Sequence, residues 1–166
     1  MKRVKQYLPF IFLFVSLFLD RHLTYLISRL FHYQFVISSQ FFLMVLLFFI
    51  LYYQKWLVYL IFIGLSFVYD SLYFHSIGIS TFLFPLLIFV GYKWLHLMTY
   101  SKIARVASFF ILIFIFNVGS YFLAVFYQMT SYSFDTFVTY HLFPTLIVNL
   151  FFYLLSEFFV KKLHLI

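Results

Sequence analysis

Side chains that could perform chemistry are few in this chain of 166 residues. It has six histidines, four acidic residues and no cysteine. The histidines form no pair at helical spacing and have no carboxylate at the spacing that metal ligands require. No glycine-rich phosphate loop, nucleophile elbow or zinc-protease motif occurs. We therefore expect no catalytic residue, no metal, no cofactor and no enzymatic activity.

Two aspartates lie next to or inside long apolar runs. Asp20 is expected to be solvated at the membrane interface, where the first apolar run ends. Asp70 stands within a longer run, and a carboxylate at membrane depth needs a partner. It is either a helix end at the outer interface or an anchor for a neighbouring helix or partner protein. In the second case Arg21 or Arg29 would be the nearest cations.

Amides and glycines also stand out in the apolar runs. Asn117 and Asn149 are expected to hydrogen-bond between membrane helices. Gly64, Gly78 and Gly91 surround the second aspartate, and glycines permit turns or close helix approach. The pattern predicts a tightly packed hairpin of the third and fourth helices.

Composition indicates which elements must hold these residues. With 66% apolar and 9% charged residues, the chain cannot form a soluble surface. At about 20 residues per crossing, we expect one all-α transmembrane domain over residues 1–166. Its six helices are predicted at about 4–23, 36–53, 56–73, 77–94, 106–127 and 137–160. An amphipathic segment at 23–31 either extends the first helix or lies in the interface, and Pro144 should kink the last helix near His141.

Basic residues predict the orientation, because lysine and arginine collect on the cytoplasmic side of membrane proteins. With six crossings, Arg21 and Arg29 fall on the outer side. The inner side collects Lys2, Arg3, Lys5, Lys55, Lys93, Lys102, Arg105, Lys161 and Lys162. We therefore expect both termini in the cytoplasm of a bacterium, with the first helix retained as an anchor. Attraction to anionic membrane lipid explains the charge of +7 without nucleic acid.

Specific motifs in the middle and near the end of the chain resemble one known family. Residues 64–70 (GLSFVYD), 76–78 (SIG), Pro85 and Gly91-Tyr92 are similar to the central signature of the rod shape-determining membrane protein MreD family. Residues 141–149 (HLFPTLIVN) resemble its last helix, in which a Pro-Thr pair precedes an asparagine. The chain length and the basic ends agree with this resemblance.

The resemblance implies a non-enzymatic membrane scaffold of the cell-elongation machinery, which regulates cell shape during peptidoglycan synthesis. Its expected partners are an MreC-like bitopic protein, a RodA-type glycosyltransferase and a class B penicillin-binding protein. Candidate partner-binding or helix-packing residues are Asp70, Gly64, Gly78, Pro85, Gly91, Pro144 and Asn149.

The family also resembles, in fold, the substrate-binding subunits of energy-coupling-factor transporters. The alternative function is therefore a subunit that binds a vitamin-like molecule for an importer. Those subunits carry an Ala-x-x-x-Ala contact in helix one, whereas this helix offers only Ser16 among bulky residues. A polar pocket would have to come from Asp70, His75, Asn117 and Gln128. Co-purification of an MreC-like protein, rather than of ATPases and a coupling protein, would favour the scaffold.

Overall fold

The computed structural model describes the backbone of residues 2–32, 34–74 and 76–162, and within these ranges the side chains of residues 9–156. Every regular element in these ranges is helical. The helices are α1 (Lys2–Leu30), α2 (Phe41–Tyr52), α3 (Lys55–Tyr73), α4 (Ile79–Lys93), α5 (Leu95–Tyr100), α6 (Lys102–Phe126), α7 (Phe134–Phe137), the π-helical turn η1 (Val138–Leu142) and α8 (Phe143–Lys162).

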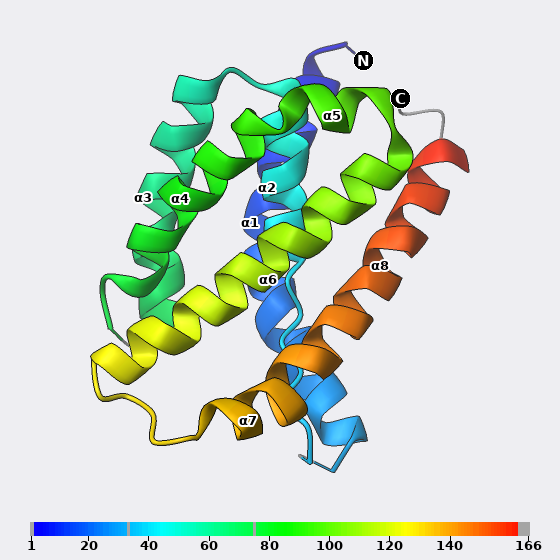
Figure 1. The fold of residues 1–166 in the computed structure, drawn as a ribbon. Helices are drawn as coiled ribbons and strands as arrows, with labels where there is room; N and C mark the ends of the chain where they lie inside the picture. Colours follow the sequence, from blue (N-terminus) through cyan, green and yellow to red (C-terminus); the bar gives the residue numbers. More distant parts are fainter. Residues whose placement is uncertain (1, 33, 75, 163–166) are drawn as a thin grey trace.

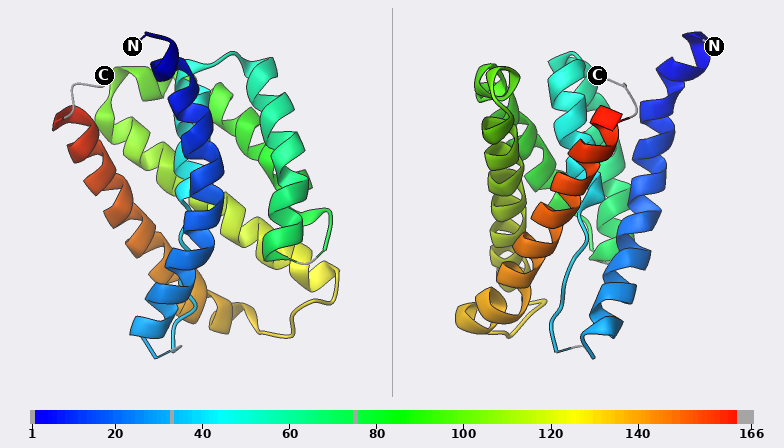
Figure 2. Two further views of the ribbon diagram at one scale, coloured as in Figure 1. Left: turned by 180° about the vertical axis from the view of Figure 1, so that it is seen from behind. Right: turned by 90° about the vertical axis from the view of Figure 1, so that its right-hand side faces the viewer.

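Successive long helices run in opposite directions through the bundle (Figure 1). The start of α1 and the end of α8 therefore lie at the same end of the molecule, as two further views confirm (Figure 2). The short helix α5 lies at this end too, while α7 and the turn after α6 lie at the other. We call the end that holds the start of α1, the end of α8 and helix α5 the basic end. The order of the elements places the lysines and arginines that were expected on the inner side at this end.

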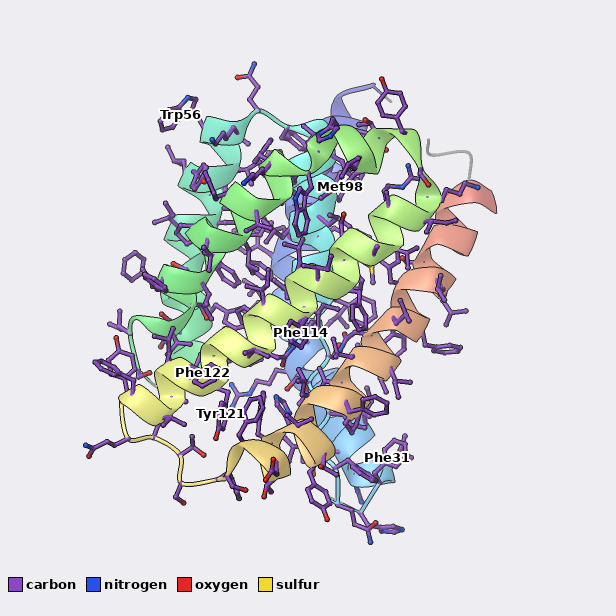
Figure 3. All side chains as sticks on the ribbon, in the orientation of Figure 1. Phe31, Trp56, Met98, Phe114, Tyr121 and Phe122 are labelled. Atoms are coloured by element: carbon purple, nitrogen blue, oxygen red, sulfur yellow. The ribbon has the colours of Figure 1, made fainter. Side chains whose placement is uncertain are left out.

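Four helical stretches are long and apolar enough to cross a membrane: Pro9–Leu30, Lys55–Tyr73, Lys102–Phe126 and Phe134–Ser156. Large apolar side chains project from the outside of the bundle, as Phe31, Phe114 and Phe122 do (Figure 3). Such a surface suits lipid rather than water. The protein is a multi-pass membrane protein. Helices α2 and α4 are apolar but shorter, at 12 and 15 residues.

Aromatic rings from several helices form the centre of the bundle. The centre of the Phe42 ring of α2 lies 5.1 Å from the centre of the Phe62 ring of α3 and 5.2 Å from that of the Phe84 ring of α4. Phe84 stacks on Phe116 of α6 at 5.6 Å. Rings in such offset and edge contacts stabilise a core beyond the area they bury. This cluster ties the short helices α2 and α4 to the long ones.

The second helix begins later than the sequence predicts, at Phe41 instead of residue 36. Residues 36–40 form no regular element and lead up to α2 through the interior of the bundle. Ile37, Ser39 and Gln40 are buried there, each at 2% exposure. The first helix, by contrast, continues through the amphipathic segment to Leu30.

Pro144 lies just after a π-helical turn, at the place where a kink is expected. A proline at this position has no N–H for the carbonyl of Tyr140, four residues earlier. The backbone N–H of Val36 donates to this carbonyl oxygen at 3.0 Å. The freed acceptor is thus satisfied by the non-helical segment 36–40, as tolerance of proline in a membrane helix requires.

The glycines differ in what surrounds them. A Cβ at Gly91 would lie 2.5 Å from Cδ1 of Ile50, so α4 and α2 approach closely there. Gly119, which the sequence reading did not single out, makes a similar approach to Leu83. Gly78 has a φ of +129°, which strongly favours glycine. A Cβ at Gly64 would meet no atom within 4 Å, so this glycine makes no close approach in the described part of the chain.

Candidate functional site: a polar cavity beside two capped helices

Asp70 is fully buried at the end of α3 and holds the start of α4. Its carboxylate accepts hydrogen bonds from the backbone N–H groups of Gly78 at 2.8 Å, Ser80 at 2.6 Å and Thr81 at 3.2 Å. The Thr81 hydroxyl donates to it at 2.9 Å. The first N–H groups of a helix lack intrahelical partners and carry partial positive charge. Asp70 is thus an anchor for a neighbouring helix, through backbone amides.

Asp20 does the same for α2. It is 0% exposed, so the expectation of a solvated interfacial residue is wrong. Its oxygens accept from the N–H groups of Phe41 at 2.6 Å and Phe42 at 2.9 Å, and from the Ser39 hydroxyl at 3.0 Å. Because α2 starts inside the bundle, no water is available to accept hydrogen bonds from its first N–H groups. The Asp20 carboxylate of α1 accepts them instead.

Side chains from two other helices, α1 and α8, satisfy much of the backbone of segment 36–40. Thr145 accepts from the N–H of Ser38 at 3.2 Å, and Thr24 accepts from the N–H of Ser39 at 2.9 Å. Asn149 accepts from the N–H of Gln40 at 2.8 Å and donates to the carbonyl of Ser38 at 2.7 Å. Asn149 therefore bonds between segments, as expected of a buried amide in a membrane protein.

A cavity of about 220 Å³ lies beside this segment, in the half of the bundle away from the basic end. Several of its lining residues, including Thr24, Ser120 and His141, are only half-buried, so the cavity reaches the surface of the bundle. The lining consists of Thr24, Ser38, Ser39, Gln40, Tyr69, Tyr73, Phe74, Phe116, Asn117, Ser120 and His141.

Gln40 belongs to this lining and has an unused hydrogen-bond acceptor. Its side-chain N–H donates to Oδ1 of Asn117 at 3.1 Å, which fixes the direction of the amide. Its Oε1 is buried and has no hydrogen-bond partner among the described residues. A buried acceptor without a partner costs about 1–3 kcal/mol. A ligand that brought a hydrogen-bond donor to this oxygen would remove that cost.

The cavity lining is neutral and offers little for catalysis. It contains no carboxylate, amine or guanidinium group. The His141 ring already bonds through Nδ1 to the carbonyl of Val36, and the Tyr73 hydroxyl donates to the carbonyl of Leu17 at 2.6 Å. Among the described residues, no three His, Asp or Glu side chains gather as a metal site would need. The arrangement can bind a neutral polar group.

The structure separates the residues that the sequence singled out. Asn117 lines the cavity, whereas Gln128 is exposed and Asp70 lies outside the lining. His75 lies outside the described residues. The importance of the polar segment from Ser38 to Gln40 is not evident from the sequence, because the helix expected at 36–53 includes it. Its importance depends on partners more than a hundred positions away, such as Thr145 and Asn149.

The similarity of this chain to known proteins identifies its family. The family described as rod shape-determining protein MreD matches residues 1–165. The chain belongs to the MreD family. A curated relative, the cell shape-determining protein MreD of Streptococcus pneumoniae (strain ATCC BAA-255 / R6), is 32% identical over 99% of this chain and 100% of its own length. No solved structure matches the chain. Membership of the MreD family implies a role in determining cell shape.

Proposed function

We propose that this MreD-family protein is a non-enzymatic scaffold of the bacterial cell-elongation machinery, which regulates cell shape by binding an MreC-like bitopic protein. The observation that carries the proposal is the family match over residues 1–165. A RodA-type glycosyltransferase and a class B penicillin-binding protein are further proposed partners. In this proposal the whole chain is one membrane-embedded domain of six crossings, with both termini in the cytoplasm.

The polar cavity is the proposed docking place for a segment of the MreC-like protein next to its membrane helix. With cytoplasmic termini, the cavity lies in the outer half of the bundle, where a bitopic partner leaves the membrane. The Oε1 of Gln40 would accept a hydrogen bond from an N–H or hydroxyl of that segment. The neutral lining supports an uncharged polar segment, because a buried charge would find no counter-charge there.

The residues proposed earlier as partner-binding would act indirectly at this site. Asp70 and Asn149 hold α4 and segment 36–40 in place, and Pro144 leaves a carbonyl for Val36. Gly78 and Gly91 permit the positive φ and the close approach that this packing needs. We propose that they support the partner site through packing, while Gly64 and Pro85 contribute to the lipid-facing helices.

Affinity purification from native membranes tests the proposal. The wild-type protein should recover an MreC-like protein. Gln40→Leu removes the acceptor and also the side-chain N–H that donates to Asn117, but it keeps the backbone N–H that bonds to Asn149. Recovery of the partner is therefore compared at equal protein abundance. Recovery of the partner should fall about fivefold, the effect of one hydrogen bond of about 1 kcal/mol. Gln54→Leu is the matched control, because Gln54 is exposed at the basic end.

The results separate the docking site from the function. Unchanged partner recovery with Gln40→Leu would refute the cavity as the docking place while leaving the scaffold intact. Failure of the wild-type protein to recover any MreC-like protein would refute the scaffold itself.

The cavity also keeps the importer subunit as a second candidate, since a space of this kind suits a small neutral molecule. Recovery of two ATPases and a coupling protein in the same purification would favour transport. Helix α1 argues against it, because it contains no alanine. Ser16 stands among bulky neighbours, and its hydroxyl already bonds to the carbonyl of Leu13 at 2.8 Å.

A further inference from the structure

A second hollow lies at the basic end, between α5 and the first turns of α6. It encloses about 280 Å³ and is lined by Trp94, Leu97, Ala104, Ala107, Ser108 and Ile111. Two of the three alanines in the whole chain belong to it. Their small side chains leave the space that bulky residues fill elsewhere on the helices. The lining is apolar except for Ser108, so the hollow suits a hydrocarbon chain.

Basic residues stand next to the lining residues of this apolar groove in the sequence. Lys93 directly precedes Trp94, and Lys102 begins α6 two residues before Ala104; both side chains are exposed. Arg105 reaches over α5 and donates to the carbonyl of Met98 at 3.4 Å. The residues that line the groove and these basic residues thus belong to the same short stretch, from Lys93 to Ile111. We call the three basic residues the basic rim.

We propose that this groove binds one anionic phospholipid from the leaflet at the basic end. An acyl chain would occupy the space above Ala104 and Ala107, and the headgroup phosphate would lie near Lys93 and Lys102. The charge of the rim decides between lipids, because basic groups between membrane helices favour anionic headgroups. A zwitterionic lipid would gain the apolar contact alone.

Trp94 provides a reporter inside the groove. The chain has two tryptophans, and the other, Trp56, is 84% exposed at the same end of the bundle (Figure 3). Trp56→Phe leaves Trp94 as the only indole, and Trp94→Phe leaves Trp56. Each variant is placed in phosphatidylcholine vesicles that contain a minority of brominated lipid. Quenching by brominated phosphatidylglycerol is then compared with quenching by brominated phosphatidylcholine.

Trp56 measures the general attraction of anionic lipid to the basic end, because Lys55 is its neighbour. The preference for phosphatidylglycerol at Trp94 should exceed that at Trp56 by about fivefold, which corresponds to one lysine near the surface. Changing both Lys93 and Lys102 to Gln should abolish the excess, and Lys55→Gln should leave the preference at Trp94 itself unchanged. High salt should weaken it without any mutation.

A third variant tests the groove itself. Ala107→Leu fills the space and should reduce quenching of Trp94 by either lipid, while the circular dichroism spectrum stays unchanged. Equal preference at the two tryptophans would overturn the proposal, since general surface attraction would then suffice. The absence of Trp94 quenching by both lipids would also overturn it. A second copy of the protein or a partner helix, and no lipid, would then cover the groove.

Discussion

At the scale of the residue, Asp20 and Asp70 bring carboxylates into the interior of a membrane protein. A charge at such depth costs about 3 kcal/mol or more when it has no partner. Both carboxylates meet the N–H groups at the start of a helix, which need an acceptor as much as the carboxylate needs a donor. Each interaction therefore removes two penalties at once.

We predict that Asp70→Asn destabilises the protein by about 2 kcal/mol, the upper range for a helix cap and for hydrogen bonds to a charged group. The amide NH₂ would face N–H donors where an oxygen now accepts. Thermal unfolding in detergent and the amount of protein in membranes measure the effect. Asp135→Asn is the control, because Asp135 is exposed and should change little. Equal stability of both variants would contradict the capping role.

We also predict that Asn149→Leu destabilises the protein by about 1–2 kcal/mol. The change keeps the branched shape of the side chain but leaves the N–H of Gln40 without Asn149 as acceptor and the carbonyl of Ser38 without Asn149 as donor. Hydrogen exchange at Gln40 should accelerate in the variant, whereas exchange in α3 should not. Slow exchange at Gln40 in the variant would show that this amide does not depend on Asn149.

At the scale of the element, local sequence patterns predict the uninterrupted helices well. The third helix was expected at 56–73 and is observed at Lys55–Tyr73; the fourth was expected at 77–94 and is observed at Ile79–Lys93. The break before Phe41 could not be predicted, because Val36 and Ile37 are apolar and the three polar residues between Ile37 and Phe41 are few enough to lie within a helix. Hydrogen bonds to residues that are distant in the sequence hold residues 36–40 outside the helix. No local sequence pattern shows these partners.

The same limit applies to the candidate site. The sequence draws attention to Asp70, Asn117 and Asn149 because polar groups in apolar runs are unusual. It gives no sign that Gln40 lies against Asn117, since the two stand 77 positions apart. The cavity depends on this pairing, so its residues could only be recognised once the helices were placed.

Helix packing gives a prediction for two glycines with opposite surroundings. Gly91→Leu should destabilise the contact of α4 with α2, because even its Cβ would meet Ile50 at 2.5 Å. Gly64→Leu has open space and should be stable, since leucine is the better helix former. Adding Ile50→Ala should restore part of the loss at Gly91. Unfolding temperatures of the three variants test this order, and equal values would contradict the close approach.

At the scale of the whole molecule, six crossings require that a helix as short as α2 belong to a segment long enough to span the membrane. Twelve residues give α2 a length of about 18 Å. The five residues of segment 36–40 would add about 16 Å if extended, and together they reach the roughly 30 Å of the hydrocarbon core. Non-helical backbone is tolerated at this depth only when protein surrounds it and satisfies its polar groups. The bonds from Thr24, Thr145 and Asn149 meet this requirement.

We therefore predict six crossings, which reporter fusions at successive connections can test. Fusions after Gln54, Ser101 and Ile166 should report the cytoplasm, and fusions after Ser76 and Ser131 should report the outer side. The reasons are the alternating direction of the helices and the gathering of lysines and arginines at one end. The fusion after Gln54 is decisive for α2, because its reporter lies outside if segment 36–40 and α2 turn back within the membrane. An outer location there, or for the fusion after Ile166, would refute the topology, since every later helix would then run the opposite way.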